Sequence, residues 1–193
     1  MTDIVTELQA RIKAEGQNLG DGILKIDSLI NHQIDPALIM RCGLELADRF
    51  RTLRVTRILT AEVSGIAPAL ATAVALGVPL VYARKTKPVT MYGPVFLETA
   101  PSHTKGIEVQ LLVAAEFMPP GERVLIIDDF LASGRTLKSL IRIVRGAKSE
   151  VVGIGAVVEK VFEGGRDVLQ KYNVPIEAVV TVTSMENGTI SFD

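Results

Sequence analysis

The segment from Val124 to Leu137, VLIIDDFLASGRTL, constrains the fold of this chain more than any other. Its apolar residues Val124 to Ile127 form the kind of unbroken run that a parallel strand has when both faces of its sheet are covered. Two carboxylates follow, and a turn of small residues then opens a helix from about Thr136 to Arg145. A buried strand that passes directly into a helix predicts a βαβ unit and a parallel α/β sheet.

Apolar strands and helices alternate through the rest of the chain, which predicts a twisted parallel sheet flanked by helices in one domain. The other expected elements are a helix at the N-terminus, a short strand at Ile23 to Ile26, a helix from Pro36 to about Phe50, a strand at Arg57 to Ala61, a helix to about Ala75, a strand at Val78 to Ala83, strands at Val151 to Val158 and Ala178 to Val182, and a short helix around Asp167 to Tyr172. Ligands of such sheets bind outside the carboxyl ends of the strands. We therefore expect the functional residues in the turns that follow the strands.

Composition excludes several classes of protein. Lysine and arginine number 21 against 22 aspartate and glutamate, so the chain lacks the excess positive charge of a nucleic-acid-binding surface. Cys42 is the single cysteine and cannot form an internal disulfide, and His32 and His103 alone are too few for a multi-ligand zinc site. Prolines and a glycine interrupt the longest apolar stretch, 66–83, so no membrane span is predicted, and the N-terminus lacks the pattern of a signal peptide. This composition favours a reducing cytoplasm.

The turn from Ala132 to Thr136 has the composition of an anion-binding site. Gly134 lets the backbone wrap closely, the first N–H groups of the helix point outward, and the two hydroxyl side chains of the turn can donate hydrogen bonds to a phosphate. Asp128 and Asp129 would repel that phosphate unless they face other groups, and sugar hydroxyls are suitable partners. A ribose 5-phosphate satisfies both requirements. The alternative is a helix N-cap with a solvated carboxylate beside it.

The order of residues in this segment resembles the signature of the type I phosphoribosyltransferases: a hydrophobic strand, an acid pair, two apolar residues and a small-Ser-Gly-x-Thr turn. KIDSLINHQIDP (Lys25 to Pro36), the turn ending in Ser64-Gly65, and GIGAVVEK (Gly153 to Lys160) extend the resemblance over nearly the whole chain, toward the bacterial members that act on xanthine. The resemblance implies binding of 5-phosphoribosyl 1-pyrophosphate (PRPP) with Mg²⁺ and transfer of its ribosyl phosphate to a nucleobase. Motifs of P-loop, dinucleotide-binding and nucleophile-elbow proteins are incomplete or absent.

The resemblance also implies an architecture and a cellular role. A small hood of about residues 1–35 and 160–193 would cover the base, and a flexible lid of about residues 85–106 would close over the substrates. The stretch 84–106 is rich in Thr, Pro, Ser and Gly, as expected of a long loop with a function. The chain would be a cytoplasmic homodimer of purine salvage that makes xanthosine 5′-monophosphate. Mg²⁺ would enter bound to PRPP, without a metal site of the protein itself, and neither nucleic acid nor membrane would be a partner.

By the same resemblance, each part of the substrates has its own residues. The purine would contact Leu24, Asn31 and Lys160. The 5-phosphate would be held by Ala132, Ser133, Gly134, Arg135 and Thr136. The pyrophosphate of PRPP would lie on the loop that contains Glu62, Ser64 and Gly65. The catalytic groups would be Asp128 and Asp129 at the ribose, with Arg84 and Lys85 stabilising the charge of the leaving pyrophosphate.

The chemistry of the purine-binding residues narrows the choice of base. The Lys160 ammonium can donate a hydrogen bond to a 6-oxo group and not to a 6-amino group, which argues against adenine. The Asn31 amide can donate to the 2-oxo group of xanthine or, flipped, accept from the 2-amino group of guanine, so both bases stay open. Hypoxanthine would leave the amide partly unpaired. His32 is expected to point away, as a neighbour in an extended segment, and Phe162 could stack on the base or make an ordinary apolar contact.

Two alternatives stand beside xanthine transfer. The first is transfer to guanine or hypoxanthine by the same mechanism. The second is a non-catalytic regulatory protein that senses PRPP, since a related fold occurs in purine repressors. Such a regulator should carry a DNA-binding domain and a basic surface, whereas this chain has little room for that domain before its first strand and a net charge of −1.

Overall fold

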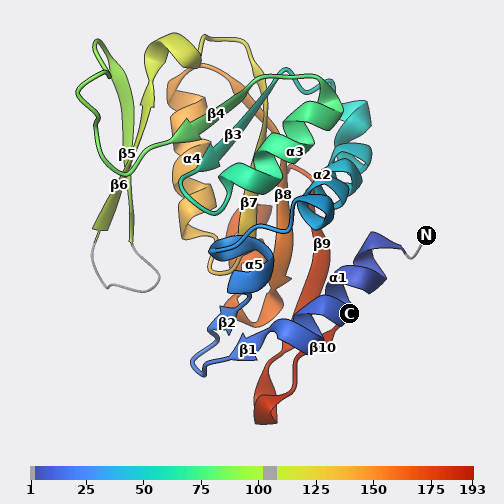
Figure 1. Ribbon diagram of the computed structural model, residues 1–193. Coiled ribbons are helices and arrows are strands. Elements are labelled where there is room, and N and C mark those ends of the chain that lie inside the picture. The colour runs from blue at the N-terminus through green and yellow to red at the C-terminus, as the bar shows by residue number, and fades with distance from the viewer. Residues whose placement is uncertain (1–2, 102–107) are drawn as a thin grey trace.

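A computed structural model describes residues 3–101 and 108–193. Its main sheet has the strand order β10-β9-β8-β7-β3-β4 (Figure 1). These strands are β3 (Arg57–Ala61), β4 (Leu80–Ala83), β7 (Arg123–Leu131), β8 (Glu150–Lys160), β9 (Ile176–Ser184) and β10 (Ser191–Phe192). All run parallel to their neighbours except β10, which pairs antiparallel with β9. The predicted parallel α/β sheet is therefore confirmed, with one antiparallel edge strand added.

Helices cover both faces of this sheet. On one face lie α1 (Ile4–Glu15), α2 (Pro36–Phe50) and α3 (Ile66–Leu76), and on the other lie α4 (Arg135–Gly146) and α5 (Gly165–Gln170). Two small antiparallel sheets complete the fold: β1 (Gln17–Asn18) with β2 (Leu24–Lys25), and β5 (Val95–Pro101) with β6 (Glu108–Ala114) beside α4 (Figure 1). Short turns of helix are η1 (Asp27–Asn31), η2 (Arg51–Leu53), η3 (Ala115–Phe117), η4 (Val161–Glu163) and η5 (Glu186–Gly188). No helix in the described ranges has the length and apolar character needed to cross a bilayer.

The first part of strand β7 is apolar without interruption because both of its faces are buried. Leu125 and Ile127 are fully buried in the core shared with α1, α2 and α3. Val124 and Ile126 alternate with them and are fully buried in the second core, shared with α4 and β6. Because side chains of a strand point alternately to its two faces, a strand between two helical layers needs apolar residues at every position.

The order in which successive strands are added to the sheet reverses at β3. From β3 the chain moves outward to the edge strand β4, and it returns as β7 on the opposite side of β3. The carboxyl ends of β3 and β7 therefore form a topological switch point, where the loops that follow neighbouring strands diverge and leave a crevice. The two loops predicted to bind phosphates are the loops at this point.

The N-terminal part of the chain differs from the prediction at one element. The strand expected at Ile23 to Ile26 is reduced to Leu24–Lys25, and the residues that follow form the π-helical turn η1, Asp27–Asn31. His32 is the C-cap of that turn, so the extended backbone predicted at this residue is wrong. The helical turn buries Leu29 and Ile30 and leaves Asn31 at its end.

Part of the predicted lid forms a regular strand and not a loop. Val95–Pro101 forms β5, which pairs with β6 from Val95 opposite Ala114 onward. Phe96 packs against the second core and Leu97, on the other face, is half-exposed, an alternation too short to stand out beside the prolines of this stretch. The predicted lid residues 102–107 lie outside the described ranges.

Candidate active site

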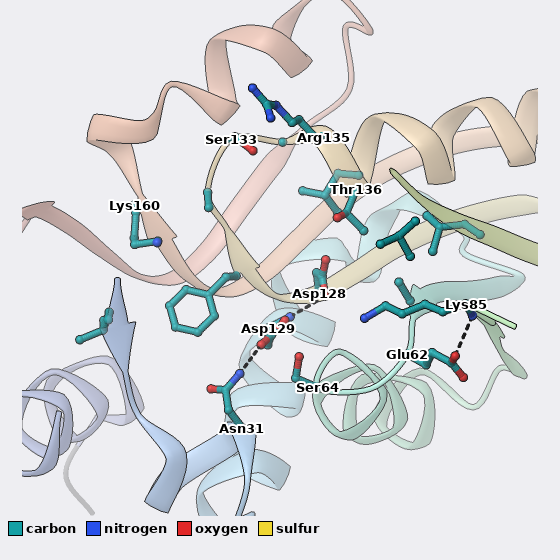
Figure 2. Close-up of a pocket in the computed structure, with 18 of the residues that line it drawn as sticks. Asn31, Glu62, Ser64, Lys85, Asp128, Asp129, Ser133, Arg135, Thr136 and Lys160 are labelled. Atoms are coloured by element: carbon teal, nitrogen blue, oxygen red, sulfur yellow. Dashed lines mark hydrogen bonds between the residues drawn. The ribbon is translucent and has the colours of Figure 1, made fainter. Parts of the chain in front are cut away.

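A pocket of about 410 Å³ opens at the carboxyl ends of β3, β7 and β8 (Figure 2). Segments far apart in the chain build it, from the β1–β2 region to the end of β8. Its walls are Ile23, Leu24, Asn31, Ala61, Glu62, Ser64, Lys85, Val109, Leu111, Asp128, Asp129, Phe130, Ala132, Ser133, Gly134, Arg135, Thr136, Leu137 and Lys160. The fold thus places the predicted phosphate, ribose and purine residues around one cavity.

The acid pair lies on the floor of this pocket, in the last part of β7. Asp128 and Asp129 are only 8% and 7% exposed, and the backbone N–H of Asp129 donates to Oδ1 of Asp128 at 3.0 Å. Burial raises the pKa of Asp128 well above its ordinary value, and the Asp129 carboxylate raises it further, while the Lys85 ammonium acts in the opposite direction. In Figure 2 the Lys85 side chain extends toward the two carboxyl groups.

The loop after β3 passes close beneath Asp128. A Cβ at Gly65 would lie 2.6 Å from Oδ1 of Asp128 and 2.3 Å from the hydroxyl oxygen of Thr60, so only glycine fits between them. Glu62 begins this loop and joins it to the next strand, because its carboxylate accepts a hydrogen bond from the backbone N–H of Lys85 at 2.6 Å. The Asp128 carboxyl group and the loop after β3 are therefore in direct contact.

The turn Ala132–Thr136 connects β7 to α4 and presents the start of that helix to the pocket (Figure 2). Gly134 has a φ of +71°, in the left-handed region that favours glycine. Gly165, the first residue of α5, supports the turn from behind, because a Cβ there would lie 2.0 Å from the carbonyl oxygen of Ala132. The N–H groups of the first turn of α4 have no acceptor within the helix, so the turn can bind an anion.

The opposite end of the pocket contains Lys160, at the end of β8. Its side chain is buried, and Nζ lies 2.8 Å from the carbonyl oxygen of Gly22 and forms an ion pair with Glu163. The ammonium is also 5.6 Å from the centre of the Phe130 ring. Phe130 and Leu24 supply apolar wall beside this charge, as expected for a site that holds a flat heterocycle by its faces and one polar edge.

Asn31 joins the two ends of the pocket. Its side-chain Nδ2 donates a hydrogen bond to Oδ2 of Asp129 at 2.7 Å. Because an ionised carboxylate only accepts hydrogen bonds, this contact fixes which end of the amide is nitrogen. In Figure 2 the amide oxygen of Asn31 points away from Asp129, toward the side of the pocket where Lys160 lies.

Two of the predicted site residues do not line the pocket. Gly65 lies beneath Asp128, and Arg84 lies beside the site with its Nε 4.0 Å from Glu62 and its guanidinium over the Tyr82 ring. Phe162 does not line it either: its side chain is 45% exposed and lies against Gly22. Phe130 lines the pocket instead, as the aromatic residue of the site.

The sequence analysis missed Phe130, Val109 and Leu111 as pocket residues. Phe130 could have been predicted from the sequence, because it directly follows the acid pair and lies on the same face of the strand as Asp128. Val109 and Leu111 belong to β6, which meets the end of β4 at the bridge between Arg84 and Leu112. No local pattern marks them as site residues.

The chain is similar to known proteins of one family. Residues 33–192 match the family model described as the phosphoribosyl transferase domain. A xanthine phosphoribosyltransferase of Deinococcus deserti is 49% identical over 177 residues, which cover 92% of either chain. A xanthine phosphoribosyltransferase of Moorella thermoacetica is 42% identical over 98% of this chain and 96% of its own length.

Solved structures of adenine phosphoribosyltransferases share the fold. The enzyme of Thermoanaerobacter pseudethanolicus superposes with a TM-score of 0.76 at 22% identity, over 92% of this chain and 99% of its own. The enzyme of Saccharomyces cerevisiae, in complex with adenine and an imino-sugar bisphosphate, gives a TM-score of 0.72 at 24% identity, over 93% and 99%. At these identities the likeness concerns the architecture and not the base.

Proposed function

Because this chain belongs to the phosphoribosyltransferase family, with the type I fold, we propose that it transfers the 5-phosphoribosyl group of PRPP to xanthine. The products are xanthosine 5′-monophosphate and pyrophosphate, so the enzyme acts in purine salvage. The observation that carries this proposal is one pocket with a phosphate-binding turn at one end, a buried acid pair in the middle and a buried ammonium at the other end.

In this proposal each charged part of PRPP binds beside a suitable group of the pocket. Its 5-phosphate would bind the turn Ala132–Thr136, at the start of α4, through backbone N–H groups and hydroxyls. Its ribose hydroxyls would donate to Asp128 and Asp129. Its pyrophosphate would lie over the loop Glu62–Gly65, on the side toward Lys85.

The base would bind between Leu24, Phe130 and Lys160. An ammonium has three N–H donors, and Gly22 and Glu163 account for two of those of Lys160, so one is left for the 6-oxo group of a purine. The bond to Asp129 uses one of the two N–H groups of Asn31 Nδ2, so the second N–H and the amide oxygen are left for the base. The N–H can donate to the 2-oxo group of xanthine, and the oxygen can accept from the 2-amino group of guanine, so Asn31 alone does not separate these two bases. The preference for xanthine is supported by the xanthine phosphoribosyltransferases to which the chain is similar.

Bond breaking at the anomeric carbon places negative charge on the departing pyrophosphate. Lys85 lines the pocket and can hold positive charge where that negative charge develops. Arg84 lies outside the lining, beside Glu62 and Tyr82, so its charge would act from a greater distance. The lid proposed for residues 85–106 would exclude water, which would otherwise capture the oxocarbenium-like centre. A fixed cation and a closed site together favour transfer to the base over hydrolysis.

We propose Mg²⁺ as the cofactor, carried into the site with PRPP. Mg²⁺ in phosphate-binding sites is held by one or two carboxylates, substrate phosphate oxygens and water, and Asp128 and Asp129 offer hard oxygen donors of this kind. The raised pKa of Asp128 fits this role, because a cation beside a buried carboxyl favours its ionised form. When bound, Mg²⁺ offsets the charge that gathers on the leaving pyrophosphate.

We also propose that the enzyme is a homodimer in the cytoplasm. Met40 and Leu44 on α2 and Leu70 and Val74 on α3 are each about half-exposed, and the two helices pack side by side. Exposed apolar residues gathered on adjacent helices are typical of a surface that a partner covers. Burial raises the pKa of the single thiol, Cys42, to about 12, so it is an unreactive core residue that suits a reducing compartment.

The proposal is tested by pyrophosphate release from PRPP and Mg²⁺ with xanthine, guanine, hypoxanthine and adenine in parallel. We expect kcat/KM to be highest for xanthine and lowest for adenine. Preference for guanine or hypoxanthine would keep the mechanism and contradict xanthine as the substrate. Tight PRPP binding without turnover of any base would contradict enzymatic function and favour a PRPP-sensing protein.

A further inference from the structure

Lys160 is a buried charge at the junction of two distant segments. It ends β8, is 7% exposed, and its Nζ lies 2.8 Å from the carbonyl oxygen of Gly22, a residue 138 positions earlier in the chain. Gly22 directly precedes Ile23 and Leu24, which form the N-terminal wall of the pocket. The position of this ammonium therefore determines how the N-terminal segment meets the end of the sheet.

Glu163 supplies the charge that this ammonium needs. Its side chain, at the end of η4, is 14% exposed and forms an ion pair with Nζ of Lys160, three residues earlier. A Cβ at Gly22 would lie 3.7 Å from Oε1 of Glu163, so carboxylate, ammonium and carbonyl form one compact group. Removing one partner of a buried ion pair leaves the other charge uncompensated, which is strongly unfavourable.

We propose that Glu163 is a positioning residue for base recognition. It holds the Lys160 ammonium so that two of its N–H groups are bound by the protein and the third is directed to the purine. It also keeps that donor in one place before the base arrives, so little side-chain freedom is lost on binding. Selection of a 6-oxo over a 6-amino purine then depends on Glu163 as well as on Lys160.

This inference rests on the proposed function, because it assumes that Lys160 reads the base. The two ends of the pocket should respond differently, since Glu163 does not line the cavity and would act on the base through Lys160. PRPP binds at the other end, at Asp128 and the turn Ala132–Thr136. Loss of Glu163 should therefore weaken xanthine binding and leave PRPP binding unchanged.

The experiment compares Glu163→Gln, Lys160→Met and the double variant by steady-state kinetics with xanthine and PRPP varied separately. We expect Glu163→Gln to raise KM for xanthine roughly tenfold, with KM for PRPP within about twofold of wild type. Because Glu163 acts through Lys160, the double variant should be no worse than Lys160→Met alone. Glu163→Asp, which keeps the charge on a shorter side chain, should restore part of the loss.

Asp48→Asn is the matched control, since it breaks another ion pair of the same sequence spacing, with Arg51, and neither residue lines the pocket. It should leave both KM values unchanged. Effects of Glu163→Gln and Lys160→Met that multiply in the double variant, or a rise in KM for PRPP equal to that for xanthine, would overturn the inference while the proposed function stands. Failure of the wild-type enzyme to use any 6-oxopurine would overturn both.

Discussion

Nδ2 of Asn31 lies 2.7 Å from Oδ2 of Asp129, so one hydrogen bond connects the part of the pocket proposed to bind the base to the part proposed to bind the ribose. Asn31 comes from the N-terminal turn η1, and Asp129 from the end of the central strand β7. A donor to an ionised carboxylate makes a strong hydrogen bond and orients its acceptor. Binding of base and of PRPP should therefore be coupled through this pair.

Asn31→Ala tests the coupling. Loss of the hydrogen bond frees the Asp129 carboxylate, so we expect KM for PRPP to rise roughly tenfold in addition to the rise in KM for xanthine. Steady-state kinetics with each substrate varied in turn will measure both. Asn18→Ala is the control, because the Asn18 amide donates to the carbonyl of Met185, away from the pocket. An unchanged KM for PRPP would show that Asn31 contacts the base alone.

Asp128→Asn should stabilise the ligand-free protein while it lowers activity. The pKa of the Asp128 carboxyl is higher in the folded than in the unfolded protein, so the folded protein binds this proton more tightly. The free energy of unfolding is therefore highest below the ordinary pKa of 3.8. It falls as the pH rises through the raised pKa of the folded state. Asparagine is neutral throughout and avoids this loss. We expect the Tm at pH 7 to rise by roughly 2–4 °C, the shift that about 1 kcal/mol produces in a domain of this size.

Thermal denaturation without ligands between pH 5 and pH 8 checks this expectation, and the gain in Tm should shrink toward the acidic end. The exposed Asp48→Asn should change Tm little at any pH in this range. A lower Tm for Asp128→Asn than for wild type at pH 7 would mean that the ionised carboxylate stabilises the fold.

Lys85→Ala should lower the rate of transfer more than substrate binding. The ammonium extends toward Asp128 from the side where pyrophosphate is proposed to leave, so its main effect should be on charge that develops during the reaction (Figure 2). We expect kcat to fall roughly 100-fold, with KM for xanthine little changed. Lys13→Ala, on the exposed side of α1 and outside the pocket lining, is the control. A change in KM with normal kcat would assign Lys85 to binding only.

Gly134→Val should abolish PRPP binding and leave the fold intact. A β-branched side chain is strained at a φ of +71°, and its Cβ would lie 3.0 Å from the carbonyl oxygen of Gly165, so the phosphate turn must change shape. Gly121→Val introduces the same kind of strain at a φ of +83°, in an open turn before β7. Calorimetric titration with PRPP should show binding by the Gly121 variant only. Normal affinity in the Gly134 variant would contradict the assignment of this turn.

Leu70→Asp tests the proposed dimer. Leu70 is 52% exposed on α3, beside the exposed apolar residues of α2, and a carboxylate there would be buried in an interface between two copies. We expect the mass measured by analytical ultracentrifugation to fall to that of one chain. Leu97→Asp, a similarly exposed leucine on β5, should leave the mass unchanged. A monomeric wild-type protein would contradict the proposal directly.

Local pattern predicted the elements that carry the phosphate and ribose residues. The run from Val124 to Ile127 is apolar because it lies between two cores, and the acids and small residues that follow belong to the same strand, turn and helix. Such features depend on near neighbours in the chain and can be recognised without the tertiary structure. The predicted site residues of this segment therefore lie together in the pocket.

Contacts between segments distant in the sequence could not be predicted from local patterns. Asn31 and Asp129 are 98 positions apart, and their hydrogen bond depends on a π-helical turn where the sequence favoured an extended segment. The contact of β6 with the main sheet likewise depends on a bridge between Leu112 and Arg84, which belong to separate segments. Side-chain alternation over a few residues does not specify which segment will lie opposite. The base end of the pocket, built from such contacts, was predicted only by family resemblance.

The path of the chain between β3 and β7 has a consequence for how this enzyme can diversify. The two strands hydrogen-bond to each other from Arg57 opposite Val124 to Leu59 opposite Ile126, although the chain makes a long excursion through β4, β5 and β6 between them. Most of that excursion lies outside the main sheet, so insertions or deletions in it need not shift either phosphate-binding loop. A new covering segment can therefore be acquired, or grafted in the laboratory, while the reacting groups keep their places.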